Sequence, residues 1–130
     1  MLLTRECEYA LRILRALKDG NMQQIKNISE TQHIPKPFVF KVVKKLNNAG
    51  ILDTRRGAGG GCILAKPLDA VTLYEVVNAV GVRVVYECIK NNATCVHNVR
   101  GECSIHHTLQ GLQNTTDQYM HNKTIAEIVF

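Results

Sequence analysis

Three of the five cysteines lie in one polar stretch of the chain, between Cys88 and His106. They are Cys88, Cys95 and Cys103, separated mostly by polar residues and a single glycine. Such a stretch can fold back on itself and point several thiolates at one centre, as a bound metal requires. A set of unrelated buried thiols is the alternative, since free cysteine is among the most buried residue types. Because the stretch lacks the periodicity of a helix or strand, a loop that binds a metal or a metal cluster is the first hypothesis.

The length and composition are typical of one small domain, or of a small domain with a dimerising extension. The chain has 130 residues and a formal net charge of +5. Charges near the start interrupt the apolar run that a signal peptide needs, and no later segment approaches the ~18 apolar residues of a membrane span. We therefore expect a cytoplasmic protein with no membrane partner. In that compartment thiols stay reduced, so the cysteines indicate metal, cluster or redox chemistry rather than disulfides.

The positive charge is concentrated in the first half of the chain. Residues 1–66 contain 12 Lys or Arg and 5 Asp or Glu, a balance of +7, whereas residues 67–130 contain 4 and 6, a balance of −2. A basic surface attracts a polyanion such as nucleic acid, although a solvated basic face is an equally good interpretation of charge alone. We divide the chain into a candidate DNA-binding domain, residues 1–66, and a part with the cysteine loop and further helices, residues 67–130.

The basic half has the outline of a helix-turn-helix. Thr4 is placed to cap a first helix that ends at Asp19–Asn21, and a short second helix is expected from Ile25 to Gln32. After a turn, Pro37 can open a third helix that Gly50 closes. The apolar stripe of the first helix is expected to consist of Cys7, Ala10, Leu11, Leu14 and Leu17.

The third helix has one face for packing and another for a DNA groove. The packing face consists of Val39, Val42, Val43 and Leu46. The other face consists of Pro37, Phe40, Lys41, Lys44 and Asn48. Lysines there suit phosphate oxygens or guanine edges, and Phe40 suits a thymine methyl group, unless its ring folds back onto the domain.

A glycine-rich hairpin follows the helix-turn-helix, with strands at residues 51–56 and 62–65 joined by residues 57–61. It lacks the Gly-Lys-Ser/Thr of a phosphate-binding loop, and Cys62 occupies the last glycine position of a dinucleotide fingerprint, so nucleotide binding is a poor interpretation. A hairpin in this place is a wing, and its glycines permit close approach to DNA. The predicted DNA-contacting residues are Lys36, Pro37, Phe40, Lys41, Lys44, Arg55, Arg56 and Gly57.

The second half supplies further helices. A fourth helix is expected over Leu73–Val80, and a capped turn or two over Thr124–Phe130. After the cysteine loop, five residues repeat at steps of four and three, the spacing of a coiled coil; an ordinary amphipathic helix containing Gly111 is the alternative. These five are Ile105, Leu109, Leu112, Thr116 and Tyr119. Since a winged helix that reads a palindrome needs two copies, the repeat favours a homodimer.

Several short segments, which occur in order along the whole chain, together resemble one known family. They are Leu3-Thr4 with Tyr9-Ala10, Ile28-Ser29-Glu30, the wing from Arg56 to Gly61, the three-cysteine loop, and the closing Thr124-Ile-Ala-Glu127. The chain is similar to the bacterial iron–sulfur winged-helix repressors, the IscR-like, NsrR-like and RirA-like regulators, whose cluster-free cousins include CymR-like proteins. Each segment alone is a weak match, whereas the combination is specific.

The resemblance implies a fold that is mainly α with a small β-hairpin wing, in which a winged helix-turn-helix is followed by a long dimerisation helix. It also implies that Cys88, Cys95 and Cys103 are the thiolate ligands of an iron–sulfur cluster. Six and seven residues separate these cysteines, whereas IscR-like loops have shorter gaps. Cys7 and Cys62 match no family ligand, so we interpret them as packed thiols.

The resemblance offers two candidates for the fourth ligand. His106 lies three residues after Cys103, where IscR-like proteins place a histidine, and it implies a two-iron cluster. Glu8 lies in the first helix, where NsrR-like relatives place a carboxylate that reaches the cluster from the partner subunit, and it implies a four-iron cluster. We favour His106 because it needs no second subunit. Glu8 can instead favour the helix N-terminus, and His106 or His107 can be a surface side chain.

The predicted function is a DNA-binding transcriptional regulator, by resemblance a repressor, that senses cluster supply, redox state, iron or nitric oxide; it is not an enzyme. Phe40 stands where IscR has a glutamate that discriminates bases, so that operator preference is not carried over. One alternative is a DNA-binding regulator with a structural zinc or no metal, although the Cys-x-x-Cys pair usual in structural zinc sites is missing. A small iron–sulfur electron carrier is another, but it leaves the basic winged half unexplained.

Overall fold

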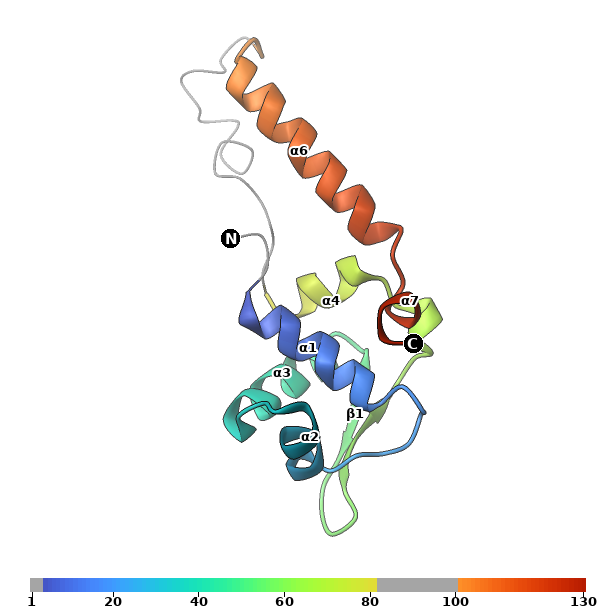
Figure 1. Cartoon of the computed structure of the whole chain (residues 1–130). Coiled ribbons are helices and arrows are strands. Elements are labelled where there is room, and N and C mark those ends of the chain that lie inside the picture. Colours follow the sequence, from blue (N-terminus) through green and yellow to red (C-terminus); the bar gives the residue numbers. More distant parts are fainter. Residues whose placement is uncertain (1–3, 82–100) are drawn as a thin grey trace.

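Figure 1 shows the computed structural model of the chain, which describes residues 4–81 and 101–130. These residues form a mainly helical protein with one two-stranded antiparallel hairpin, which confirms the predicted fold class. None of the helices in these ranges is long and apolar enough to cross a membrane. The elements in chain order are α1 (Arg5–Ala16), α2 (Ile25–Gln32), α3 (Lys36–Asn48), β1 (Leu52–Arg55), β2 (Gly61–Leu64), η1 (Leu68–Ala70), α4 (Leu73–Ala79), α6 (Ser104–His121) and α7 (Ile125–Val129).

The first helix, α1, lies at the centre of the molecule and contacts α2, α3, α4 and α7. Thr4 occupies its N-cap position, as predicted, but the Thr4 hydroxyl lies 3.8 Å from the Cys7 sulfur and accepts no backbone N–H. The predicted stripe is too narrow: Ile13 is fully buried as well, whereas Leu11 is only partly buried. Neighbours on several sides widen the buried face of α1 beyond a single stripe.

The turn between α2 and α3 gives the helix-turn-helix its shape. His33 ends α2 in the left-handed conformation, with φ of 54°, and the Ser29 hydroxyl donates to the carbonyl of Ile34 at 2.6 Å. Pro35 is the N-cap of α3, so α3 begins at Lys36, one residue before the predicted start. The packing face predicted for α3 is buried at all four positions.

The wing is anchored to the start of α2. In the hairpin, Leu52 pairs with Leu64 and Arg55 pairs with Gly61. Gln23 forms a bridge to Cys62 through two backbone hydrogen bonds of 2.9 Å. Gly61 makes this close approach possible, because a Cβ at that position would lie 2.2 Å from the Gln23 carbonyl oxygen. The wing therefore has a fixed position relative to α2 and α3.

The C-terminal helix α7 joins the hydrophobic core of the winged part. Thr124 and Glu127 form a complete capping box, which confirms the predicted cap, and Thr72 and Glu75 form another at the start of α4. The backbone N–H of Ile125 donates to the carbonyl oxygen of Val71 at 2.8 Å. One core thus extends across the expected division at residue 66; its largest fully buried members are Ile13, Leu14, Leu17, Ile28, Ile34, Leu46, Ile51, Leu52 and Ile125.

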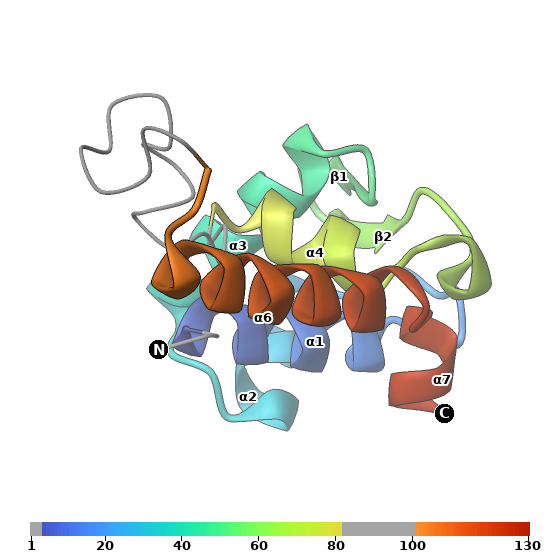
Figure 2. The same cartoon turned by 90° about the horizontal axis from the view of Figure 1, so that it is seen from above.

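The long helix α6 projects away from this core (Figure 1) and lies over α1 and beside α4 when seen from above (Figure 2). Its last turn is anchored through Met120 in the core and through the His121 ring, which stacks on Tyr74 at 3.8 Å between centroids. Two stripes of side chains run along α6, each with its residues spaced seven positions apart, and one stripe is buried while the other is exposed. The buried stripe is His106, Gln113 and Met120, and the exposed stripe is Ile105, Leu112 and Tyr119.

Candidate nucleic-acid interface and metal centre

A groove of about 710 Å³ lies between α3, the start of α2 and the wing. Its walls include Phe40 and Lys44 from α3, together with Arg55, Arg56 and Gly57 from the wing, and all five of these residues are exposed. Five of the eight residues predicted to contact DNA thus meet in one place, although they come from two separate elements. The groove is basic, and its lining contains no Asp or Glu.

Three predicted DNA-contacting residues lie outside the lining of this groove. Lys36 is exposed at the start of α3, with its ammonium nitrogen 6.0 Å from the centre of the Phe40 ring. Pro37 is exposed in the same first turn. Lys41 is also exposed, but its ammonium group forms a 2.7 Å ion pair with Glu6 of α1. Lys44, in contrast, has no acidic partner in residues 4–81 and 101–130.

Glu6 connects α1 to α3 through two lysines one helical turn apart. Its two carboxylate oxygens lie 2.7 Å from Lys41 and from Lys45. Hydrogen bonds from Lys41 and then Lys45 lower the pKa of the Glu6 carboxyl group, so it is charged at neutral pH. Lys45 also donates to the carbonyl of Val80 at 3.0 Å. Lys45 thereby links α3, the candidate recognition helix, to the end of α4.

Seven further groove residues were absent from the predicted DNA contacts, namely Gln24, Ile25, Val43, Asn47, Thr54, Gly60 and Gly61. Asn47 follows Phe40 by seven residues, so the helical spacing that placed Phe40 and Lys44 on one face also predicts Asn47 there. Gln24 and Ile25 had no such signal. They line the groove because Gln23 pairs with Cys62 and brings the start of α2 beside the wing.

Two of the four favoured ligands of the candidate metal centre, Cys103 and His106, lie within the described residues. Cys88 and Cys95 lie outside the described residues, whereas Cys103 is the N-cap of α6 and His106 lies in its first turn. His106 is buried, with 9% exposure, and its Nδ1 atom has no hydrogen-bond partner among the described residues. His107 is exposed and its Nε2 atom lies 2.6 Å from the Gly101 carbonyl. A buried, unpaired imidazole nitrogen one helical turn from a cysteine fits a metal ligand.

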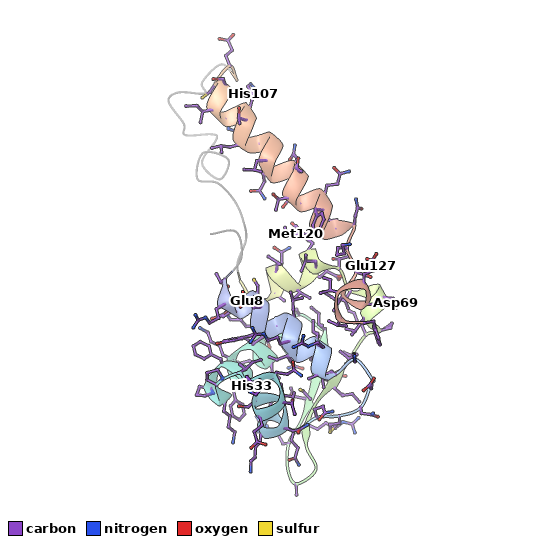
Figure 3. The ribbon with its side chains drawn as sticks, in the orientation of Figure 1. Glu8, His33, Asp69, His107, Met120 and Glu127 are labelled. Atoms are coloured by element: carbon purple, nitrogen blue, oxygen red, sulfur yellow. The ribbon has the colours of Figure 1, made fainter. Side chains whose placement is uncertain are left out.

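The alternate ligand Glu8 lies elsewhere in the chain. It is exposed in the first turn of α1, and Figure 3 places it on the winged part, far from His107 at the outer end of α6. Glu8 and His106 are therefore not neighbours within one chain. Among the described residues, no three His, Cys, Asp or Glu side chains form a cluster suited to a metal ion.

The other two cysteines are packed thiols, as predicted. Cys7 and Cys62 are 1% and 0% exposed, respectively, within the core. Burial raises the pKa of the Cys62 thiol to about 11, so it stays protonated at neutral pH. A thiol of this kind is a poor metal ligand, because metals bind the thiolate.

The fold and the basic groove define a winged helix-turn-helix DNA-binding protein. The model of the Rrf2 family, described as an iron-dependent transcriptional regulator, matches residues 3–130. The chain belongs to the Rrf2 family of transcriptional regulators, and it is therefore not an enzyme.

Individual relatives agree with this assignment. The chain is 26% identical over 132 residues to a helix-turn-helix-type regulator of Aquifex aeolicus, covering 99% of this chain and 92% of the relative. It is 38% identical over 80 residues to NsrR of Bacillus subtilis, covering 59% and 55%. Among solved structures, the B. subtilis global cysteine regulator CymR matches with a TM-score of 0.76 at 19% identity, covering 99% and 96%. The IscR of T. potens matches with 0.72 at 16%, covering 99% and 86%.

Proposed function

We propose that this chain is a transcriptional repressor that binds operator DNA as a homodimer and responds to the state of a bound iron–sulfur cluster. The groove between α3 and the wing supports the DNA-binding part, because a phosphate backbone is attracted to basic residues with no acidic group between them. The DNA-contacting residues are those that we predicted from the sequence, with Lys44, Arg55 and Arg56 foremost. A regulator of chromosomal genes acts in the cytoplasm, so that remains our expected location.

Cys88, Cys95, Cys103 and His106 would hold the cluster, and a two-iron cluster is favoured over a four-iron one. The observation that carries this part is the buried Nδ1 atom of His106, which has no protein partner within the described residues and lies one turn after Cys103. A buried polar atom that lacks a hydrogen bond costs about 1–3 kcal/mol, so a native site normally supplies a partner. A bound metal is such a partner.

The link from cluster to DNA runs through the end of α4. The cysteine loop follows α4, and Lys45 of α3 donates to the carbonyl of Val80, eight positions before Cys88. A change in the loop that shifts this end of α4 would act on the recognition helix. A coupling free energy of about 1 to 3 kcal/mol is enough to change operator occupancy many-fold.

The homodimer is supported by the exposed stripe of α6. Ile105, Leu112 and Tyr119 are 67%, 46% and 63% exposed, yet they repeat every seven residues, as side chains in a helix–helix seam do. A small hollow of about 210 Å³ beside Ile105 offers room for a side chain of the second copy. Burial of the stripe in two chains stabilises the pair by on the order of 10 kcal/mol, comparable with the cost of association.

The test is the metal content of anaerobically purified protein with single alanine substitutions. We expect the wild type to be coloured, with about two irons and two sulfides per chain, and Cys95→Ala to lose both. Cys62→Ala is the matched control, because its protonated thiol should contribute nothing to the cluster. Normal iron and sulfide in Cys95→Ala would disprove the cluster assignment. A colourless wild type with one zinc per chain would favour the structural zinc site instead.

A second pair of variants identifies the fourth ligand. We expect His106→Ala to lose or alter the cluster spectrum and Glu8→Ala to keep it. His107→Ala is the control for His106, because the His107 ring lies next to it but already contacts the Gly101 carbonyl. The opposite result, an altered cluster only in Glu8→Ala, would assign the ligand to Glu8 of the partner chain and raise the expected content to four irons.

A further inference from the structure

Phe40 is an apolar side chain that does not pack in the hydrophobic core. The four aliphatic residues of α3 at positions 39, 42, 43 and 46 are buried, and Phe38 packs edge-on against Tyr9 with 5.6 Å between ring centres. Phe40 is 55% exposed, and the ammonium group of Lys36 lies 6.0 Å from the centre of its ring. The ring lines the basic groove rather than the core. Packing therefore does not explain it.

The neighbours of Phe40 in the groove define what it can contact. Lys44 and Asn47 follow at four and seven residues, so the three side chains lie along one face of α3. Across the groove stand Arg55 and Arg56 of the wing. These arginines suit the phosphate backbone. The side chains on this face of α3 are then the ones that can contact the base edges. No carboxylate lines the groove, so the amino group of cytosine has no charged acceptor there.

Each base edge has a chemical signature in the major groove. The thymine methyl group is the apolar feature that an exposed ring can contact, whereas a lysine can donate to N7 and O6 of guanine. Four residues of helix advance about 6 Å, and successive base pairs are about 3.4 Å apart. Residues 40 and 44 therefore reach positions about two base pairs apart at most.

On the basis of the proposed DNA-binding function, we propose that Phe40 is a specificity-determining residue that reads a thymine methyl group, and that Lys44 reads a guanine within about two base pairs of it. Each operator half-site then carries a thymine and a guanine at this separation. The remaining DNA contacts of the wing fix the orientation of the protein without selecting these bases.

The experiment starts from a site that the wild-type protein selects from a pool of randomised duplex DNA. If no sequence is enriched, the proposed function itself fails. In the selected duplex, each thymine is replaced in turn by uracil, which removes only the methyl group. Wild type should lose about fourfold in affinity at one thymine per half-site, the fold-change for withdrawing about one buried methyl group.

Protein variants then test whether Phe40 causes this loss. Phe40→Ala should bind the thymine and uracil duplexes equally, whereas Phe40→Leu should still prefer thymine. Phe38→Ala is the matched control, since it removes the other exposed ring of α3 and should keep the wild-type preference. An equal preference for thymine in Phe40→Ala and wild type, or no uracil effect at any position in wild type, would overturn the assignment.

The guanine is tested in the same duplex. Replacement of the neighbouring guanine by 7-deazaguanine, which lacks the N7 acceptor, should weaken wild type severalfold and leave Lys44→Ala unaffected. If Lys44→Ala suffers the same loss as wild type, another residue reads that base. Because Lys44→Ala also loses charge, the comparison is made between duplexes for each protein and not between proteins.

Discussion

The winged region, residues 4–81, and the long helix α6 bury their residues in opposite ways. The winged region buries its aliphatic side chains, with Leu14 and Leu46 both 0% exposed, and presents lysines and arginines outside. In α6 the polar side chains of His106 and Gln113 are buried, while Leu112 and its stripe are exposed. Both patterns come from helices of the same chain.

The difference shows which part is complete in one chain. The winged region, closed by α7, has a continuous core that buries its large aliphatic residues within one chain, and Phe40 at the groove stays 55% exposed. The exposed stripe of α6 is unsatisfied in a single chain, and the buried Nδ1 atom of His106 and Oε1 atom of Gln113 have no hydrogen-bond partner within the described ranges. The winged region forms its DNA-binding groove within one chain, whereas α6 has an exposed apolar stripe and buried polar atoms that need further partners.

The largest effect is expected from breaking the exposed stripe of α6. Leu112→Asp places a charge in each half of the proposed seam, so we expect a monomer at micromolar concentration. Operator affinity should fall about a hundredfold or more, because the two half-sites are no longer bound by one linked pair. Sedimentation velocity and fluorescence anisotropy measure the two effects. The helical circular dichroism of the winged region should remain, because its core does not include Leu112.

Asn114→Asp is the control for that substitution. Asn114 is an exposed residue of the same helix, outside the apolar stripe, and aspartate keeps the oxygen that accepts from Gln110. It should therefore remain a dimer with unchanged operator affinity. A dimeric Leu112→Asp protein would show that α6 is not the seam, and the contrast between the two regions would lose its explanation.

An intermediate effect is expected from the basic surface of the winged region. Arg56→Ala should lower affinity for all DNA sequences roughly three- to tenfold and flatten the dependence of log K on log salt by about one unit. The reason is that Arg56 lines the groove and forms no ion pair in the described part of the chain. Binding isotherms at several salt concentrations measure the slope.

Lys18→Ala removes the same charge from a distant place. Lys18 lies beyond the end of α1, with its ammonium group 5.6 Å from the centre of the Phe130 ring, and it does not line the groove. This variant should keep the wild-type slope. Equal slopes for Lys18→Ala and Arg56→Ala would mean that net charge, and not the groove, governs binding.

The smallest effect is expected from Glu6, and it has the opposite sign. Glu6→Gln removes the carboxylate that pairs with Lys41, so non-specific DNA affinity should rise by about twofold to fivefold. The free energy of unfolding should fall by about 1 kcal/mol or less, since partly exposed ion pairs contribute little. Asp69→Asn is the control, because Asp69 is an exposed acid in η1 that does not line the groove. Lower DNA affinity in Glu6→Gln would contradict the prediction.

The same variant has a defined pH dependence. Because the pKa of Glu6 is lowered in the folded protein, its stabilisation is present above the ordinary glutamate pKa of about 4.3 and is lost as pH falls through the lower folded value. The difference in unfolding free energy between wild type and Glu6→Gln should therefore be largest near neutral pH and shrink in acid. Urea unfolding at both ends of this range measures it; a difference that grows in acid would have the wrong sign.

The sequence by itself determined the local elements. The bounds of α2 agree with the prediction, as do the capping box of Thr124 with Glu127 and the packing face of α3. These features depend on residues within about one or two helical turns of each other. Hydrophobic period and cap residues therefore specify them without knowledge of the rest of the chain.

The tertiary structure decided which of these local elements meet. Lys41 and Lys44 have the same chemistry and lie three positions apart, yet one pairs with Glu6, 35 positions earlier, and the other lines the groove. Likewise, the seven-residue repeat of α6 predicted a seam, but not that the adjacent stripe with His106 would be the buried one. Periodicity fixes the faces of a helix. Which face is covered depends on contacts with residues far away in the sequence, and those contacts form only when the chain folds.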